Sequence, residues 1–124
     1  MDRPLRDVVS SLTLEAADKI VDGALRAARA ENLLPLAVAV LDSGGHLVAF
    51  KREDGCGLLR VEIAQSPVPG GVLILDTRGA AIGAVGISGD TSDKDEYCAI
   101  QGVRGAGLTP DPAEPNPEWK ASGL

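Results

Sequence analysis

The sequence predicts an α+β fold built on two β-hairpins and two main helices. Three features indicate it: an amphipathic pattern near the N-terminus, two pairs of short apolar runs joined by glycine-containing turns, and a second helical pattern from Ser92 onward. With 124 residues, 44% hydrophobic and 24% charged, the chain is long enough for one core and lies in the globular range. We expect a single domain over residues 1–107, followed by an extended proline-rich arm over residues 108–124.

The first helix is expected to start after Thr13, a residue type favoured at helix N-caps. Apolar residues then recur at spacings of three, four and seven, while charged residues occupy the opposite side. The apolar positions are Leu14, Ala17, Val21, Ala24, Leu25 and Ala28. Asn32 is suited to close the helix, and Pro35 prevents its continuation.

A first hairpin is predicted after this helix. Leu36–Leu41 is an uninterrupted apolar run, and a turn that begins at Asp42 and contains Gly44 and Gly45 leads into a second strand. Asp42 is expected to fold back on the backbone N–H groups of the turn, and both glycines to supply positive φ angles. Alternation along the second strand would place four side chains on one face: His46, Val48, Phe50 and Arg52.

The second half of the chain is expected to contain a short helix, a hairpin and a closing helix. A short helix is predicted at Leu58–Ala64, and a second hairpin joins Val72–Leu75 to Ala81–Ile87. Ser92, with Asp95 three residues later, predicts a capping box at the start of the closing helix. The tail is expected to lack regular structure because it contains Pro110, Pro112, Pro115 and Pro117.

Charge and composition argue against several classes of partner. The net charge of −6 and the pI near 4.6 leave no basic stripe for nucleic acid or for an anionic membrane. Phe50, Tyr97 and Trp119 are the only aromatic residues, so bases have few stacking platforms. No apolar run approaches the length of a membrane span. Cys56 and Cys98 form no CxxC pair and are expected to be ordinary thiols in a cytoplasmic protein.

His46 is the only histidine and the first candidate for metal ligation or proton transfer. Arg52, expected on the same face, would suit a ligand carboxylate beside it. The backbone of Gly70 and Gly71 could donate N–H groups to an anion. Structural alternatives stand beside these roles, since a histidine after a turn is often solvent-exposed and Arg52 has acidic neighbours in sequence.

A group of carboxylates precedes and begins the closing helix, comprising Asp90, Asp93, Asp95 and Glu96. Acidic residues at a helix start stabilise the helix dipole without any metal, and this explanation is preferred over a cation site. No serine lies in a nucleophile elbow, and the single histidine has no matched partner for a hydrolase triad. The sequence therefore identifies no catalytic residue.

Several motifs, in order along the chain, resemble the GlcG/HbpS family (DUF336), which is related to the C-terminal domain of PduO-type proteins. They lie between Leu12 and Gly107: Thr13-Leu14-Glu15, Val40–Ala49, Arg52–Gly55, Pro69–Val72, and Gly83–Gly89 leading into Asp95-Glu96. The resemblance implies a central antiparallel β-sheet flanked by helices, a profilin-like sandwich, often assembled into higher oligomers.

One departure from the family pattern concerns the middle of the chain. Relatives usually continue the helix begun at Leu58 and add further helical sequence before the Pro-Gly-Gly strand. In this chain that segment between Ala64 and Ser66 is missing. Either the chain is naturally shortened or the sequence omits a stretch, and whatever pocket wall that helix provides in relatives is not transferred to this chain.

The resemblance implies a small-ligand-binding accessory protein that takes haem, a corrinoid or a small catabolic molecule. Haem is the expected cofactor, with His46 as metal ligand and with Arg52, Gly70 and Gly71 near the pocket. Two alternatives remain open. One is a small catabolic enzyme that acts on a carboxylated substrate with His46 as acid or base and Arg52 as clamp. The other is a structural oligomeric subunit.

A homo-oligomer is expected on a second ground. The predicted strands carry apolar residues on both faces, and the predicted helices are too few to cover them, so an apolar patch should remain for a second copy. The proline-rich arm ends near Trp119, a residue type frequent at interfaces, and we expect Trp119 to pack on a neighbouring chain.

Overall fold

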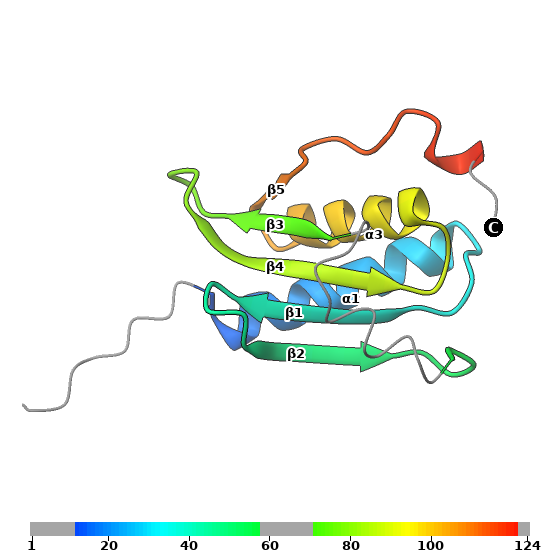
Figure 1. Ribbon diagram of the computed structural model, residues 1–124, viewed down its shortest axis with the longest axis horizontal. Helices are drawn as coiled ribbons and strands as arrows, with labels where there is room; N and C mark the ends of the chain where they lie inside the picture. Colours follow the sequence, from blue (N-terminus) through cyan, green and yellow to red (C-terminus); the bar gives the residue numbers. More distant parts are fainter. Residues whose placement is uncertain (1–11, 58–70, 122–124) are drawn as a thin grey trace, which may run out of the picture.

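The computed structural model describes residues 12–57 and 71–121 and shows a five-stranded antiparallel sheet with two α-helices on one of its faces (Figure 1). The predicted α+β class is confirmed. In chain order the elements are α1 (Leu14–Ala30), β1 (Ala37–Asp42), β2 (Leu47–Arg52), β3 (Val72–Leu75), β4 (Ala81–Ser88), α3 (Ser92–Gly105), β5 (Thr109–Asp111) and the short 3₁₀ helix η1 (Trp119–Ala121). The predicted helix at Leu58–Ala64 and the candidate Gly70 lie outside the described residues.

The sheet has the strand order β2-β1-β4-β3-β5, so the two predicted hairpins lie side by side and β1 pairs with β4 between them. α1 and α3 contact each other and cover the same face of the sheet, where they enclose the main core (Figure 1). The opposite face carries a small buried cluster of Ala37, Ala39 and Cys56, with Phe50 packed against it. We refer to this opposite face of the sheet as the helix-free face of the described residues. Neither described α-helix has the length and apolar character needed to cross a membrane.

Helix α1 forms where the apolar periodicity predicts it. The Thr13 side chain accepts a hydrogen bond from the Ala16 N–H at 3.0 Å, which confirms the N-cap. The buried face consists of Ala17, Ile20, Val21, Ala24 and Ala28. Asn32 follows the helix in a left-handed conformation with φ of 55°, as expected for a residue that ends a helix before a proline.

Contact between α1 and α3 depends on small residues at the crossing. A Cβ atom added at Gly102 of α3 would lie 2.5 Å from the Ile20 carbonyl oxygen and 3.1 Å from the Ala24 nitrogen of α1. A Cβ at Gly23 would in turn lie 3.1 Å from the Gly102 Cα. The two backbones therefore approach more closely than any side chain between them would allow.

Three local predictions need correction. The N-cap of α3 is Thr91 rather than Ser92, because the Thr91 hydroxyl accepts from the Lys94 N–H, while Asp95 accepts from the Asp90 N–H at 3.0 Å. In the first hairpin turn only Gly45 has positive φ, at 82°, because one left-handed residue is enough for this turn.

The third correction concerns β2, in which a bulge interrupts the alternation. Val40 pairs with Ala49 but Leu41 pairs with Leu47, which leaves Val48 as an extra residue. Val48 consequently packs against the helix-side core, away from Phe50 on the other face. The prediction that His46, Val48, Phe50 and Arg52 share one face was therefore wrong.

Regular structure extends into the proline-rich arm, contrary to the prediction. Thr109–Asp111 pairs with β3 as the edge strand β5, where a proline is tolerated because one side of the strand has no partner to donate to. The arm then runs back along α3 (Figure 1). Arg104 near the end of α3 contacts Ala113 and Glu114, and Asn116 donates to Asp93 at 3.2 Å.

The Trp119 ring stacks on Tyr97 of its own chain, with 3.7 Å between ring centroids and 11° between planes. One ring face is thus covered from within the chain, and packing of Trp119 on a neighbour stays a prediction. Lys120 lies 5.6 Å from the Trp119 ring centroid and 3.4 Å from a Glu31 carboxylate oxygen, which ties the arm to the end of α1.

We expect Tyr97→Ala to release the arm, because the stack of Tyr97 on Trp119, worth about 0.5–1.5 kcal/mol, joins η1 to α3. Trp119 is the only tryptophan, so its fluorescence reports the change directly. The emission should move to longer wavelength and become easier to quench with acrylamide. Tyr97→Phe keeps the ring and should behave as wild type. Identical quenching of Trp119 in the alanine variant would contradict this role.

Candidate functional site

The first hairpin turn is organised around Asp42. One carboxylate oxygen, Oδ1, accepts hydrogen bonds from the backbone N–H groups of Gly44 and His46, both at 2.9 Å. The bond from the His46 N–H contributes most to holding the pKa of Asp42 below its usual value, and the bond from the Gly44 N–H adds to it. The expected turn role of Asp42 is confirmed.

His46 ends this turn with its side chain 82% exposed. Its Nδ1 lies 3.3 Å from Asp42 Oδ1, which leaves Nε2 for another partner. A carboxylate that holds one imidazole nitrogen while the other binds a metal is a common arrangement in metal sites, since it fixes the ring orientation and raises ligand basicity.

The second hairpin turn repeats the first in detail. Asp76 Oδ1 accepts from the N–H groups of Arg78 and Ala80, both at 2.9 Å, as Asp42 does from Gly44 and His46. Gly79 has the same φ of 82° as Gly45, and a register irregularity follows each turn. Residues 38–49 and 72–83 are thus equivalent hairpin segments, both with Leu-Asp before the turn.

Sheet order places the two turns at the same end of the molecule. Because the order is β2-β1-β4-β3, the second hairpin is the first one displaced by two strands, a distance of about 10 Å. The chain directions in Figure 1 show both turns at the left-hand edge of the sheet. Two turns that are distant in sequence therefore face the same region of solvent.

A hollow of about 240 Å³ lies between these turns. It is lined by Leu41, Asp42, Ser43 and Gly45 of the first hairpin and by Leu73, Ala81, Gly83 and Ala84 of the second. We refer to it as the inter-turn hollow. The pairing register puts four side chains in one row across the sheet: Leu47, Leu41, Ala84 and Leu73.

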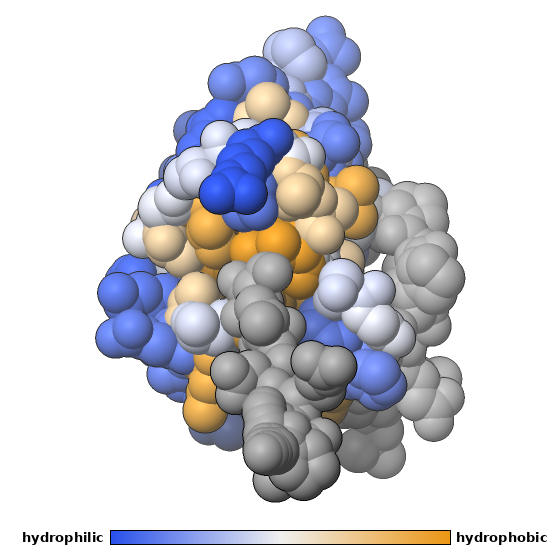
Figure 2. All heavy atoms as spheres, turned by 90° about the vertical axis from the view of Figure 1, so that its left-hand side faces the viewer, coloured by the Kyte–Doolittle hydropathy of each residue, from blue (hydrophilic) through white to orange (hydrophobic). Residues whose placement is uncertain are grey.

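This row belongs to the helix-free face, because Leu41 alternates with Val40, which packs against the helix-side core. Leu47 and Leu73 remain 48% and 44% exposed. Figure 2, which views the molecule from the turn end, shows an apolar patch with hydrophilic side chains around it. The described part of the chain thus offers an apolar surface beside two polar turns.

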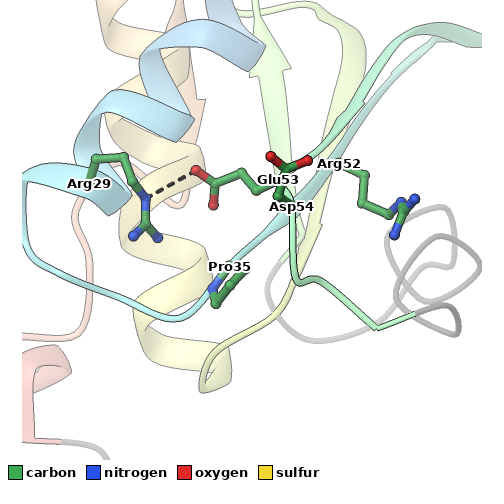
Figure 3. Close-up of a pocket in the computed structure, with 5 residues that line it drawn as sticks. All are labelled: Arg29, Pro35, Arg52, Glu53 and Asp54. Carbon is green, nitrogen blue, oxygen red and sulfur yellow. Dashed lines mark ion pairs between the residues drawn. The ribbon is translucent and has the colours of Figure 1, made fainter.

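A second and more polar pocket of about 440 Å³ lies at the other end of β2, lined by Arg29, Pro35, Arg52, Glu53 and Asp54 (Figure 3). Its charges are largely used within the chain. Arg29 Nε lies 3.0 Å from Glu53 Oε2, and Glu53 Oε1 accepts from the buried Leu36 N–H at 2.8 Å. Arg52 points away from this ion pair and donates to the Cys56 carbonyl at 3.0 Å. The charged side chains of this pocket chiefly connect α1, β1 and β2 to one another.

The predicted site residues are not brought together. His46 and Arg52 lie at opposite ends of the six-residue strand β2, about 20 Å apart along the chain direction. Gly71 directly precedes β3, three strands away from β2 in the sheet. A ligand that contacts both His46 and Arg52 of one chain would have to span most of the length of β2.

The carboxylates at the start of α3 bind the backbone. Asp90 accepts from the Leu34 N–H and the Thr91 N–H, both at 2.8 Å, and Asp95 accepts from the Asp90 N–H. Burial, together with the negative charge of Asp93, raises the pKa of Glu96. Among residues 12–57 and 71–121, no group of three or more His, Cys, Asp or Glu side chains is arranged to hold a metal ion.

Cys56 and Cys98 are both buried, and no disulfide joins them. Burial raises the pKa of Cys98 to about 12, so this residue stays protonated and is a poor metal ligand. Tyr97, whose pKa is also raised by burial, is covered on one face by Trp119. Among the described residues, His46 is the histidine that could bind haem iron, and its side chain is 82% exposed.

The inter-turn hollow was not predicted from the sequence. A signal was present, since the segment Leu-Asp-Ser-Gly-Gly at residues 41–45 matches Leu-Asp-Thr-Arg-Gly at residues 75–79. This repeat indicates two equal turns. Their position side by side follows only from the pairing of β1 with β4.

Comparison with known proteins identifies relatives of this fold. The family model described as "Haem degrading protein HbpS-like" matches residues 12–67 and 65–104. The two matched pieces meet where the family resemblance places the missing segment. No curated protein matches the sequence.

Solved structures agree with this match. A crystal structure of HbpS is 26% identical, with a TM-score of 0.69 over 84% of this chain and 96% of that one. The Klebsiella pneumoniae protein ORFY, of the DUF336 family, is 20% identical, with a TM-score of 0.66 over 86% and 97% of the two chains. A PduOC:heme complex is 16% identical, with a TM-score of 0.70 over 78% and 96%. The matched model covers more than half of the chain, which therefore belongs to the HbpS-like family.

Proposed function

We propose that this protein binds haem at the inter-turn hollow, with His46 as the axial ligand. The observation that carries the proposal is the position of the only imidazole in the chain: His46 ends the turn whose Asp42, Ser43 and Gly45 line an apolar hollow. The description of the family model names haem degradation, and one structural relative is a haem complex, which supports the same ligand.

The donor set favours a metal that brings most of its own ligands. A bare zinc or copper ion is usually held by three or four protein side chains, and no such group exists in the described part of the chain. Haem supplies four nitrogen ligands and takes one or two more from protein. A single imidazole held at Nδ1 by Asp42 fits that requirement. When bound, the group would supply redox chemistry that no side chain of the described residues provides.

The shape of the site favours a flat ligand that remains partly in solvent. The hollow, about 240 Å³ in volume, is smaller than pockets that enclose a drug-sized ligand, which usually exceed about 300 Å³. Leu41, Leu73 and Ala84 share one face of the sheet and offer an apolar surface to one side of such a ligand. A corrinoid is a second tetrapyrrole of this kind and is the alternative outcome of the test.

Titration with haem tests the proposal. Wild type should show a shifted Soret band that saturates, and His46→Ala should weaken binding by about tenfold or more because the axial bond is lost. Free imidazole added to His46→Ala should restore the band position. An unchanged spectrum with wild type at saturating haem would rule the proposal out, and an unaltered band in His46→Ala would exclude His46 as the ligand.

The alternative of a catabolic enzyme with His46 and Arg52 at one substrate loses support from the geometry, because the two residues lie at opposite ends of β2. One observation still supports the alternative of a structural subunit: Leu47 is exposed on the edge strand β2. We therefore propose assembly of several copies as a property that accompanies binding. The two cysteines, which no disulfide joins, support a cytoplasmic location, where thiols stay reduced.

Light scattering at micromolar concentration tests the assembly, for which we expect a mass larger than that of one 12.7 kDa chain. Leu47→Lys should lower this mass, because a charge on an edge strand opposes pairing with another chain. Leu34→Lys alters another exposed leucine, outside the sheet, and should leave the mass unchanged. A monomeric wild type would refute the assembly.

A further inference from the structure

We propose that the β3–β4 turn is the second half of the ligand site and that Arg78 binds an acid group of the ligand. The inference rests on the proposed function, since it takes the inter-turn hollow as the place where the apolar body of the ligand lies. It replaces Arg52, which is too distant from His46, with a cation at the same end of the sheet.

The equivalence of the two turns shows which side chains the turn itself does not need. Each turn depends on its aspartate, which accepts two backbone hydrogen bonds, and on its glycine at φ of 82°. Arg78 occupies the position of Gly44, and Ala80 that of His46. The same backbone forms with either residue at these places, so the geometry of the turn does not explain the arginine.

The placement of the two side chains suits one flat ligand. The turns are two strand spacings apart, about 10 Å, and the hollow is lined by residues of the first turn and by strand residues of the second hairpin, among them Ala81 directly after the second turn. His46 belongs to the first turn and Arg78 to the second, so their backbones are separated by a distance on the scale of a porphyrin ring. A ligand that lies on Leu41, Ala84 and Leu73 could have its centre near the turn of His46 and one edge near the turn of Arg78.

Arg78 is available for such a contact. Arg29 is paired with Glu53, Arg52 with the Cys56 carbonyl and Arg104 with Glu114. No hydrogen bond or ion pair engages the Arg78 guanidinium within residues 12–57 and 71–121. Its backbone N–H is fixed by Asp76 at 2.9 Å, so the side chain starts from a defined position. A guanidinium can bind a carboxylate through two parallel hydrogen bonds.

Electrostatics add a reason for a cation at this turn. The chain carries a net charge of −6, which opposes the approach of a ligand with two carboxylates. Within the two turns, residues 42–46 and 76–80, Arg78 is the only side chain with a permanent positive charge. The Oδ1 atoms of Asp42 and Asp76 accept backbone hydrogen bonds, and within residues 12–57 and 71–121 no ion pair joins either carboxylate to the guanidinium.

Metal-free protoporphyrin IX separates this contact from the bond to His46. We would compare its dissociation constant in wild type, Arg78→Gln and Arg26→Gln, with haem titrated in parallel. Arg26 is an exposed arginine in the second half of α1, remote from both turns, and controls for the loss of one charge. Arg78→Gln should raise the dissociation constant by about tenfold, while Arg26→Gln should change it little. The dimethyl ester of protoporphyrin, which has no acid group, should bind wild type and Arg78→Gln equally.

The outcomes distinguish the two proposals. Equal dissociation constants of the free acid for wild type and Arg78→Gln would overturn the role of Arg78 while the haem site stands. An equal loss for the acid and the ester would also overturn it, because the arginine would then act on the shape of the site. A wild type that binds neither haem nor protoporphyrin would overturn both proposals.

Discussion

Replacing Gly102 by valine is expected to lower the free energy of unfolding by about 3 kcal/mol or more, a large effect for a single substitution. The first added carbon would lie 2.5 Å from the Ile20 carbonyl oxygen and 3.3 Å from the Ala24 Cβ. Both belong to the rigid helix α1, so no side-chain rotation relieves the contact. The two helices must separate, and the core they share with the sheet must open.

Urea unfolding followed by circular dichroism measures this loss, and Gly105→Ala provides the matched control. Gly105 is the last residue of α3, and a Cβ added there would meet nothing within 4 Å. Alanine at that position should leave stability unchanged or raise it by up to about 1 kcal/mol, through its higher helix propensity. Equal midpoints for Gly102→Val and wild type would show that the helices do not pack as described.

The second large effect is expected for Glu53→Ala, at about 2–3 kcal/mol of unfolding free energy. The Glu53 side chain is only 18% exposed, and its two oxygens hold the Leu36 N–H and the Arg29 guanidinium. Leu36 is fully buried, so its N–H would lose its only described partner where water is scarce.

Glu53→Gln separates the two contributions. The amide oxygen can still accept from the Leu36 N–H, while the charge toward the half-exposed Arg29 is lost, and exposed ion pairs contribute little. We therefore expect glutamine to restore more than half of the stability lost in Glu53→Ala. If both variants lose the same amount in denaturant unfolding, the ion pair and not the backbone contact would carry the effect.

Elements defined by local patterns were predictable from the sequence. Helix α1 is marked by its apolar period and by Thr13, and both hairpins by apolar runs on either side of Asp- and Gly-containing turns. In each case the deciding interactions join residues close in sequence. The N-cap of α3 was predicted one residue too late. Thr91 and Ser92 are both residue types that cap helices, and the sequence alone does not show at which of them the helical backbone begins.

Features that depend on distant pairing were not predictable in the same way. The strand β5 forms because β3 presents an unpaired edge to Thr109–Asp111, which the local prolines argue against. The bulge at Val48 changes which residues share a face with Arg52. The inter-turn hollow requires β1 beside β4, a register that no local pattern specifies. His46 was a candidate because it is the only histidine, whereas its surroundings depend on the assembled sheet.

The crossing of α1 and α3 also has a consequence for synthesis of the protein. The apolar stripe of α1 leaves the ribosome early, but the surface that covers it, around Gly102, emerges only after most of the chain has been made. At about 5–20 residues per second, the interval between Ile20 and Gly102 is on the order of ten seconds. During that time the apolar face of α1 in the nascent chain is not yet covered by α3. We therefore expect the yield of folded protein in cells to depend on chaperones that bind short apolar segments.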